Sequence, residues 1–276
     1  MSAMITKYIT YLACVKRYSP NTTLAYEKDV RAFARWAREN LYEPRWSTIT
    51  REDMDKYVIY MVYHEKSPAT VNRHISSVKS FYNYLIREGL MTKNPLRWMS
   101  YNKLPETIPN TIPEGDLEVC YHHSQGSVGL MIRLLYTTGV RIQELLDIEK
   151  TDIDADKLRI RIHGKGQRDR YVFTCPDVMQ ELVEYCEGRY GQPFAGIDQF
   201  AVRRAIYFEL KKYSNAKQLS PHAIRHTFAT KAAAQGCNAT TLQVMLGHKQ
   251  LKTTQKYIDL GRHDVQQAFQ TYATVH

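Results

Sequence analysis

The chain has 276 residues, of which 43% are hydrophobic and 24% are charged, so it is long enough for about two domains with a core in each. This composition excludes wholesale disorder, and no run of about 18 apolar residues is present that could span a membrane. Lysine and arginine number 38 against 28 acidic residues, for a formal net charge of +10, which favours a polyanionic partner without identifying one.

The excess of basic residues is concentrated in the first part of the chain. Residues 1–110 hold 17 basic and 10 acidic residues, whereas the rest holds 21 and 18. We therefore expect the N-terminal part to make most of the contact with a polyanion.

Helical spacing dominates the first 95 residues. Apolar side chains recur every three or four positions in the segments 5–15, 26–37 and 71–85, which is typical of amphipathic helices. Ser19 and Ser67 each precede a proline and predict two helix starts, and Thr50 with Asp53 predicts a capping box at a third. The sequence thus predicts three or four helices.

The helix predicted over 71–85 carries a polar face opposite its apolar stripe. Asn72, Arg73, Ser76, Ser77 and Lys79 occupy that face, and we expect them to be exposed. Such side chains are suited to phosphates or to base edges in a DNA groove. An ordinary solvated helix face accounts for the same pattern equally well.

A polar stretch separates two predicted domains. Four of the ten prolines lie between residues 94 and 114, where they hold the chain extended and remove hydrogen-bond donors. We predict a helical domain over residues 1–95, a linker over 96–113 and a second domain over 114–276.

The second domain is predicted to be mainly helical with a small antiparallel sheet. Two runs rich in β-forming residues, 158–162 and 170–175, flank the glycine-rich stretch 164–167, which indicates a hairpin. Helical patterns lie on both sides of it, at 130–136, 178–190, 202–213, 223–234 and 240–246.

The five cysteines are widely spaced, odd in number and without a Cys-x-x-Cys pair. This pattern predicts reduced thiols and a cytoplasmic location. Only a short apolar stretch, 8–15, lies near the N-terminus, between two lysines, so we expect neither an export signal nor a membrane anchor.

No metal or nucleotide cofactor is expected. The acidic series that begins at Asp152 lacks the glycine and the final glutamate of a calcium loop. His222 and His226 have the spacing of zinc ligands on a helix, but Ala223 stands where a zinc protease has its glutamate, and Arg225 would put a cation beside the metal. A glycine-rich phosphate-binding loop is absent from the sequence as well.

Four segments of the second domain carry a resemblance to a known family. They are TTGVRIQEL at 137–145, GKGQRDR at 164–170, HAIRHTFAT at 222–230, and LGH at 246–248 followed by TTQKY at 253–257. In this order they resemble the tyrosine recombinase (phage integrase) family, of the Xer-like or simple integrase type. The first domain resembles that family's helical core-binding, SAM-like domain.

The resemblance implies a site-specific DNA recombinase that needs no metal or high-energy cofactor. Six catalytic residues are carried over by their place in the motifs: Arg141, Lys165, His222, Arg225, His248 and Tyr257. A covalent 3′-phosphotyrosine link preserves the energy of the phosphodiester bond during strand exchange, and Tyr257 would form it. Arg141 and Arg225 would neutralise the charge that builds on the phosphate oxygens.

The remaining roles concern protons and positioning. Lys165 matches the general acid for the leaving 5′-oxygen, and His222 would transfer a proton or orient the phosphate. His248 would donate a hydrogen bond to the phosphate. Glu144 either orients an active-site arginine or histidine or forms an ordinary helix salt bridge, and His226 is expected to be a supporting residue.

The partner implied by the resemblance is double-stranded DNA with a specific recombination site, held between the two domains. The predicted DNA-binding residues are Asn72, Arg73, Ser76, Lys79 and Arg168. The resemblance further implies a homotetramer on DNA or a hetero-assembly with a related recombinase, and no membrane. The apolar segment 265–269 would belong to a tail that docks on a neighbouring protomer.

Two other functions share parts of this pattern. A catalytically silent DNA-binding protein would keep the fold, although the complete set of six residues argues against it. A type IB topoisomerase would use similar tyrosine chemistry to relax supercoils on any sequence. Among recombinases, the sequence leaves dimer resolution, integration, excision and inversion open.

Overall fold

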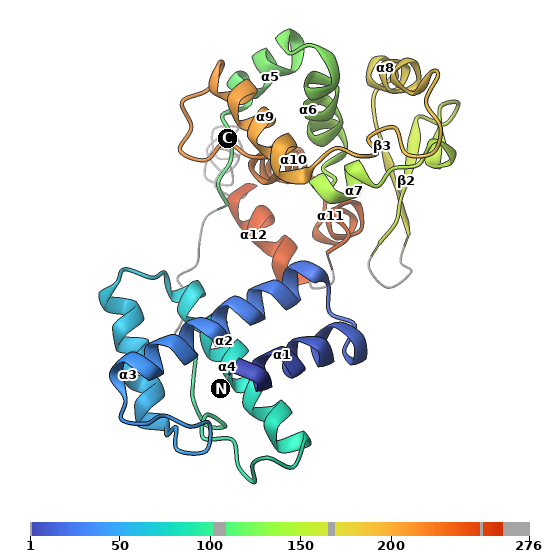
Figure 1. The fold of residues 1–276 in the computed structure, drawn as a ribbon. Helices are drawn as coiled ribbons and strands as arrows, with labels where there is room; N and C mark the ends of the chain where they lie inside the picture. The colour runs from blue at the N-terminus through green and yellow to red at the C-terminus, as the bar shows by residue number, and fades with distance from the viewer. Residues whose placement is uncertain (1, 102–108, 165–168, 249–250, 262–276) are drawn as a thin grey trace, which may run out of the picture. The chain divides into compact units, whose positions relative to one another are not determined.

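The computed structural model describes residues 2–101, 109–164, 169–248 and 251–261. The chain divides into two compact units between residues 106 and 107 (Figure 1), within the stretch predicted as a linker. Both units are mainly helical, and the predicted fold class is confirmed. In the described ranges no helix is both long and apolar enough to cross a membrane.

The first unit is built from helices. Its α-helices are α1 (Ser2–Thr10), α2 (Pro20–Asn40), α3 (Arg51–Tyr63) and α4 (Pro68–Arg87), and a π-helical turn, Tyr11–Val15, follows α1. The three predicted starts are confirmed. The side chains of Ser19 and Ser67 accept hydrogen bonds from backbone N–H groups at the starts of α2 and α4, and Thr50 and Asp53 form the capping box of α3.

An aromatic cluster fills the core of the first unit. Phe33 packs against Tyr57 with ring centroids 5.1 Å apart, and Trp46 against Phe81 at 4.6 Å. Edge-to-face and tilted pairs of this kind add to the burial of apolar area. Leu96 and Met99, which lie in the predicted linker, are buried in this same core.

A buried carboxylate joins α2 to α4. Asp29 is 1% exposed and accepts hydrogen bonds from Arg73 Nη1 at 2.6 Å and from Ser77 Oγ at 2.8 Å. His74 Nε2 lies 3.1 Å from the same carboxylate. Ser77 is therefore buried, and its predicted exposure is wrong, because the helix face that carries it supplies the partners that Asp29 needs in the interior.

The second unit places several helices around a small sheet. Its α-helices in the described ranges are α5 (Glu114–His123), α6 (Gly126–Thr138), α7 (Ile142–Leu146), α8 (Pro176–Cys186), α9 (Gln199–Lys211), α10 (Pro221–Ala234), α11 (Ala239–Leu246) and α12 (Leu251–Gly261). The helix expected over 178–190 stops at Cys186, because the chain turns at Gly188, whose φ is +68°.

The predicted hairpin is present and gains a third strand. β2 (Arg159–Ile162) pairs antiparallel with β3 (Arg170–Phe173), with Ile160 opposite Val172. The two-residue strand β1 (Ile153–Asp154) lies on the other side of β2, and a short 3₁₀ turn, Lys150–Asp152, precedes it. The residues at the tip of the hairpin, 165–168, lie outside the described ranges.

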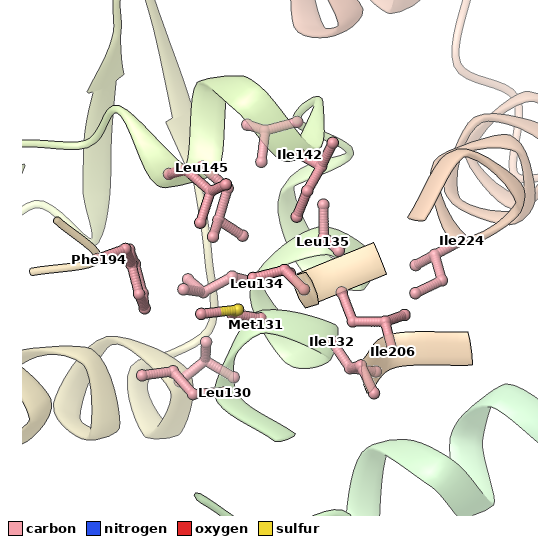
Figure 2. Packing of buried hydrophobic residues seen from close by; sticks show 14 of the residues in the cluster. Leu130, Met131, Ile132, Leu134, Leu135, Ile142, Leu145, Phe194, Ile206 and Ile224 are labelled. Carbon is pink, nitrogen blue, oxygen red and sulfur yellow. The ribbon is translucent and has the colours of Figure 1, made fainter. Parts of the chain in front are cut away.

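Helix α6 is at the centre of the second core. Figure 2 shows Leu130, Met131 and Leu134 of α6 among apolar side chains from neighbouring elements. Ile142 and Leu145 of α7 and Ile224 of α10 join the same cluster. The core therefore holds the start of α7 and the first turns of α10 in fixed places, and these two positions carry Arg141 and Arg225.

We predict that Asp29→Ala destabilises the first unit by about 2–3 kcal/mol, because the change removes the charged acceptor of the Arg73 guanidinium and leaves the buried Ser77 hydroxyl with only the Arg73 carbonyl oxygen as an acceptor. All three tryptophans of the chain, Trp36, Trp46 and Trp98, lie in this unit, so tryptophan fluorescence during urea unfolding measures it selectively. Asp55→Ala, at an exposed position, serves as the control and should change stability by less than about 0.5 kcal/mol. Equal stability of the two variants would contradict the role given to Asp29.

Candidate active site

One carboxylate gathers the arginines of the site. Glu144, in the first turn of α7, accepts hydrogen bonds from the backbone N–H of Arg141 at 2.8 Å and from Arg141 Nη1 at 2.6 Å. Arg170 of β3 binds both of its oxygens, with Nη2 at 2.7 Å and Nη1 at 3.1 Å. Arg225 Nη1 lies 3.9 Å away. The positioning role predicted as one option for Glu144 is thus the arrangement observed.

Glu144 is ionised at any physiological pH. Burial by itself would raise the pKa of its carboxyl, but the hydrogen bonds from Arg170 and Arg141 outweigh burial and lower the pKa to about 2. Its charge therefore offsets part of the repulsion among the three guanidinium groups.

Arg225 is the largest of the fully buried side chains that the structure describes, at 1% exposed. Nη1 donates to the carbonyl oxygen of Gly139 at 2.6 Å, and Nη2 donates to that of Leu246 at 2.6 Å. These carbonyls lie at the C-terminal ends of α6 and α11, where unpaired carbonyl groups and the helix dipole favour a cation. Burial, and next the nearby Arg141, lower the pKa of Arg225 to about 9, so the guanidinium remains charged at neutral pH.

Glycine is required where Arg225 meets the end of α6. Gly139 has a φ of +63°, in the left-handed region, and a Cβ atom there would lie 2.3 Å from the Phe228 ring. Any side chain at 139 would thus displace the carbonyl group that Arg225 binds.

The ring of His248 is held between two partners that decide its tautomer. Arg225 Nη2 lies 3.1 Å from Nε2, and because arginine offers only donors, Nε2 must accept. The proton is then on Nδ1, which lies 3.0 Å from Thr254 Oγ1 and donates to it. Burial, followed by the charge of Arg225, lowers the pKa of His248 to about 4, in agreement with a neutral ring. Donation from His248 to a phosphate, as predicted, requires Nε2 to release Arg225 and take up a proton.

Tyr257 is buried on α12 and is 3% exposed. Its ring packs with Ala229, Leu242 and Leu246 from α10 and α11. Its hydroxyl lies 2.6 Å from His226 Nδ1. Burial raises the pKa of Tyr257, whereas Arg225 and Arg141 act in the opposite direction, so the phenol is protonated at neutral pH.

Two hollows open beside these residues and share Arg141. The larger has a volume of about 900 Å³, and Glu144, Arg170 and His248 are among the residues that line it. The second has a volume of about 630 Å³, and Arg203, Arg204 and His222 contribute to its wall together with Arg225. Of the described residues, arginines and no carboxylate line the second hollow, which suits a phosphate group, whereas Asp147 and Asp169 also line the larger one.

The structure brings five of the six predicted catalytic residues into one region of the second unit. Arg141, Arg225, His248 and Tyr257 are linked by the contacts above, and His222 lies one turn before His226 on α10, with ring centroids 4.2 Å apart. Lys165, Arg168 and the segment 265–269 lie outside the described residues. The chemical roles of these residues stay predictions.

The predicted DNA-binding residues of the first unit lie along α4. Arg73 is engaged by Asp29, and Ser76 Oγ donates to the backbone carbonyl of Asn72 at 3.0 Å. The Lys79 ammonium lies 5.8 Å from the centre of the Tyr101 ring. Arg73 therefore has a structural role in joining α2 to α4, and DNA contact by the four residues stays a prediction.

Sequence reasoning missed two side chains that complete the site, Arg170 and Thr254, and predicted only a supporting role for His226. Arg170 binds Glu144, Thr254 accepts from His248, and His226 is the partner of the Tyr257 hydroxyl. Each lies inside one of the motif segments, and that position was the one sign in the sequence of a role at the site. Their contacts join positions up to 31 residues apart, and no local pattern encodes such pairs. In the described ranges, no three His, Cys, Asp or Glu side chains are grouped as ligands for a metal ion, and all five cysteines are free thiols.

Comparison with known proteins identifies the sequence family. Residues 117–263 match the model described as "Phage integrase family", and residues 5–89 match "Phage integrase, N-terminal SAM-like domain". The tyrosine recombinase XerC of Lactobacillus delbrueckii subsp. bulgaricus is 29% identical over 275 residues, which cover 91% of this chain and 92% of the relative. XerC of Listeria innocua is 28% identical over 288 residues, and the match covers 95% of each chain.

Solved structures share the fold. The XerH site-specific recombinase bound to a palindromic difH substrate matches with a TM-score of 0.78 at 15% identity, and the match covers 99% of this chain and 85% of that one. A lambda integrase dimer bound to a COC' core site gives 0.73 at 17% identity, covering 94% and 77%. The Tn1549 transposon integrase in complex with transposon right end DNA gives 0.72 at 19% identity, covering 96% and 98%.

We predict that Glu144→Gln destabilises the second unit by about 3 kcal/mol at pH 7, because the neutral amide cannot offset the surrounding guanidinium charges. The folded pKa of about 2 lies below the ordinary 4.5, so this stabilisation is present above pH 4.5 and is lost as the pH falls toward 2. Calorimetric unfolding at a series of pH values should show the difference from wild type narrowing in that window. Glu184→Gln, an exposed position that keeps an acceptor for Gln180, is the matched control, and a pH-independent difference for Glu144→Gln would contradict the assignment.

Proposed function

Because the chain belongs to the phage integrase family and is a site-specific tyrosine recombinase, we propose that it cleaves and rejoins duplex DNA through a 3′-phosphate bond to Tyr257. The observation that carries the proposal is the meeting of Tyr257, Arg225 and His248, which come from three separate parts of the second unit. The His248 ring stacks over that of Tyr257 with centroids 6.3 Å apart and accepts a hydrogen bond from Arg225. A phenol, a buried guanidinium and a neutral imidazole in one place fit attack on a phosphodiester.

The arginines would stabilise the charge that develops during the attack. Arg141, with its side chain 42% exposed, faces both hollows and can bind a phosphate from solvent. A guanidinium has five N–H donors, and three of those of Arg225 are taken by Gly139, Leu246 and His248. The two that remain, with those of Arg141, would bind the nonbridging oxygens in a fixed geometry.

The leaving 5′-oxygen needs a proton to depart, and Lys165 is proposed as its donor. His222 is exposed, and its pKa is lowered by partial removal from water and then by Arg225 and Arg141. A neutral His222 would orient the phosphate or take part in proton transfer. Since the phosphotyrosine link keeps the energy of the broken bond, rejoining would need no metal or high-energy cofactor.

Double-stranded DNA with a specific recombination site is the proposed partner. The relatives with the same fold named above include recombinases and integrases in complex with DNA. The excess of basic over acidic residues in positions 1–110, 17 against 10, supports phosphate contacts by the first unit, including those proposed for Asn72, Arg73, Ser76 and Lys79. Arg168 is proposed to contact the DNA backbone as well. Assembly as a homotetramer or with a related recombinase, in the cytoplasm, completes the proposal.

We predict that Tyr257→Phe abolishes the covalent protein–DNA adduct while leaving DNA binding within about twofold of wild type, because only the hydroxyl is removed and the ring still fills its place among Ala229, Leu242 and Leu246. A nicked suicide substrate traps the adduct, which is read as a band that resists denaturation. Tyr190→Phe, at a position 97% exposed, should form the adduct like wild type. An adduct with Tyr257→Phe would show that another residue is the nucleophile.

We predict that Arg225→Lys slows cleavage about a hundredfold, or by ~3 kcal/mol, although it preserves the charge, because one ammonium cannot bind both helix-end carbonyls and a phosphate as a planar fork does. Single-turnover rates on the suicide substrate measure the effect. Arg189→Lys, an exposed position in the same unit, should leave the rate unchanged. Cleavage by Arg225→Lys at the wild-type rate would remove Arg225 from the charge clamp.

A further inference from the structure

Among the residues that the structure describes, His226 makes the closest polar contact with the proposed nucleophile, Tyr257. His226 Nδ1 and the Tyr257 hydroxyl are 2.6 Å apart, which is within the usual range for proton transfer along a hydrogen bond. The rings meet at a centroid distance of 5.6 Å. The contact joins α10 to α12, and Tyr257 has little access to water that could take its proton instead.

Burial and charge keep His226 neutral. Removal from water, followed by the neighbouring His222 and Arg225, lowers its pKa to about 4. A neutral imidazole has one nitrogen that accepts. A phenolic hydroxyl can either donate or accept. In the tautomer with the His226 proton on Nε2, the hydroxyl donates to Nδ1. In that tautomer the pair is in the state that precedes proton transfer from the tyrosine.

The other histidines of the site are less suited to this task. Both nitrogens of His248 are engaged, with Nε2 accepting from Arg225 and Nδ1 donating to Thr254. Across the described part of the second unit, no hydrogen bond joins His222 to Tyr257. His226 is thus the histidine whose ring nitrogen Nδ1 faces the hydroxyl.

We propose that His226 is the general base of the reaction, which accepts the phenolic proton of Tyr257 as its oxygen attacks the phosphate. The inference rests on the proposed function and adds a residue to it. In the step, the O–H bond of Tyr257 breaks and the proton passes to Nδ1. The phenolic oxygen then forms the new bond to phosphorus with its electron pair. The bond from phosphorus to the 5′-oxygen breaks, and that oxygen takes a proton from the general acid. In rejoining, the 5′-hydroxyl attacks phosphorus and returns its proton to the group that acted as general acid. The bond from phosphorus to the phenolic oxygen breaks, and the departing phenolate recovers its proton from His226.

The surroundings of His226 suit a base that is used transiently. His222 and Arg225 face it from its own helix, Lys256 and Tyr257 from α12, and His248 from the segment after α11. The nearby cations disfavour a lasting imidazolium, so the proton is returned readily when the strand is rejoined. A bound phosphodiester brings the negative charge that stabilises the imidazolium while it exists.

The test uses His226→Asn in the full chain. The Asn amide oxygen can take the place of Nδ1 and hold the hydroxyl, but it cannot accept the proton. We expect covalent cleavage of the suicide substrate to slow by about 10²–10³-fold, with DNA binding retained. On a substrate with sulfur in the 5′-bridging position, the leaving group needs no acid. The cleavage rate of His226→Asn should be reduced by the same factor on that substrate, whereas the cleavage rate of Lys165→Ala should recover. His122→Asn, the same change at an exposed position, is the matched control and should cleave like wild type.

The pH dependence separates a base from a residue that only supports the fold. Without a base, attack requires a phenolate formed in solvent, so the His226→Asn rate should rise about tenfold per pH unit between pH 7 and 9, while the wild-type rate stays nearly level. If His226 only supported the fold, its replacement would lower the cleavage rate by the same factor at every pH. If His226→Asn does not bind DNA, His226→Gln, which is equally unable to titrate, takes its place in the same assays.

Each outcome decides one question. Failure of the wild type to form an adduct on a verified binding site overturns the proposed function and the inference with it. A wild-type adduct together with normal cleavage by His226→Asn overturns the inference alone. Faster cleavage by the variant would show that His226 restrains Tyr257, and rescue by the bridging sulfur would place His226 at the leaving group; both results overturn its role as the base.

Discussion

The carboxylate of Glu144 is the interaction on which the site depends. Three guanidinium groups, from the start of α7, from β3 and from α10, lie around it. Without a negative charge among them, their mutual repulsion in a partly buried place would drive the elements apart. The bidentate bond to Arg170 also ties the hairpin to α7, so one side chain sets both the charge and the spacing of the site.

Backbone carbonyl groups also stabilise the buried guanidinium of Arg225. The carbonyls of Gly139 and Leu246 are helix ends that need donors, and Arg225 needs acceptors, so each satisfies the other. The same meeting point fixes the neighbouring rings: Arg225 determines the tautomer of His248, which in turn binds Thr254 of α12. The helix that carries Tyr257 is thereby connected to the buried arginine through two hydrogen bonds.

Local features of this molecule could be predicted from the sequence, and long-range contacts could not. The starts at Ser19 and Ser67 are readable because a cap bonds to a residue three positions on. The five-residue α7 is too short for apolar spacing to indicate it. The motif resemblance placed Arg141 and Arg225 correctly in one region, but the burial of Ser77 against Asp29 and the pairing of His226 with Tyr257 arise only when distant segments pack.

One hydrogen bond of Arg225 already occupies a group that a bound phosphate would use, the Nε2 atom of His248. His248 Nε2 can donate to a phosphate only after it releases Arg225, so binding at this point is an exchange of partners. The free energy gained from the phosphate is the difference between old and new bonds, which is smaller than either. A DNA backbone that only touches the surface would gain too little free energy to replace this hydrogen bond. Selectivity for a correctly seated phosphodiester would then begin with the hydrogen bond between Arg225 and His248, which only such a ligand replaces.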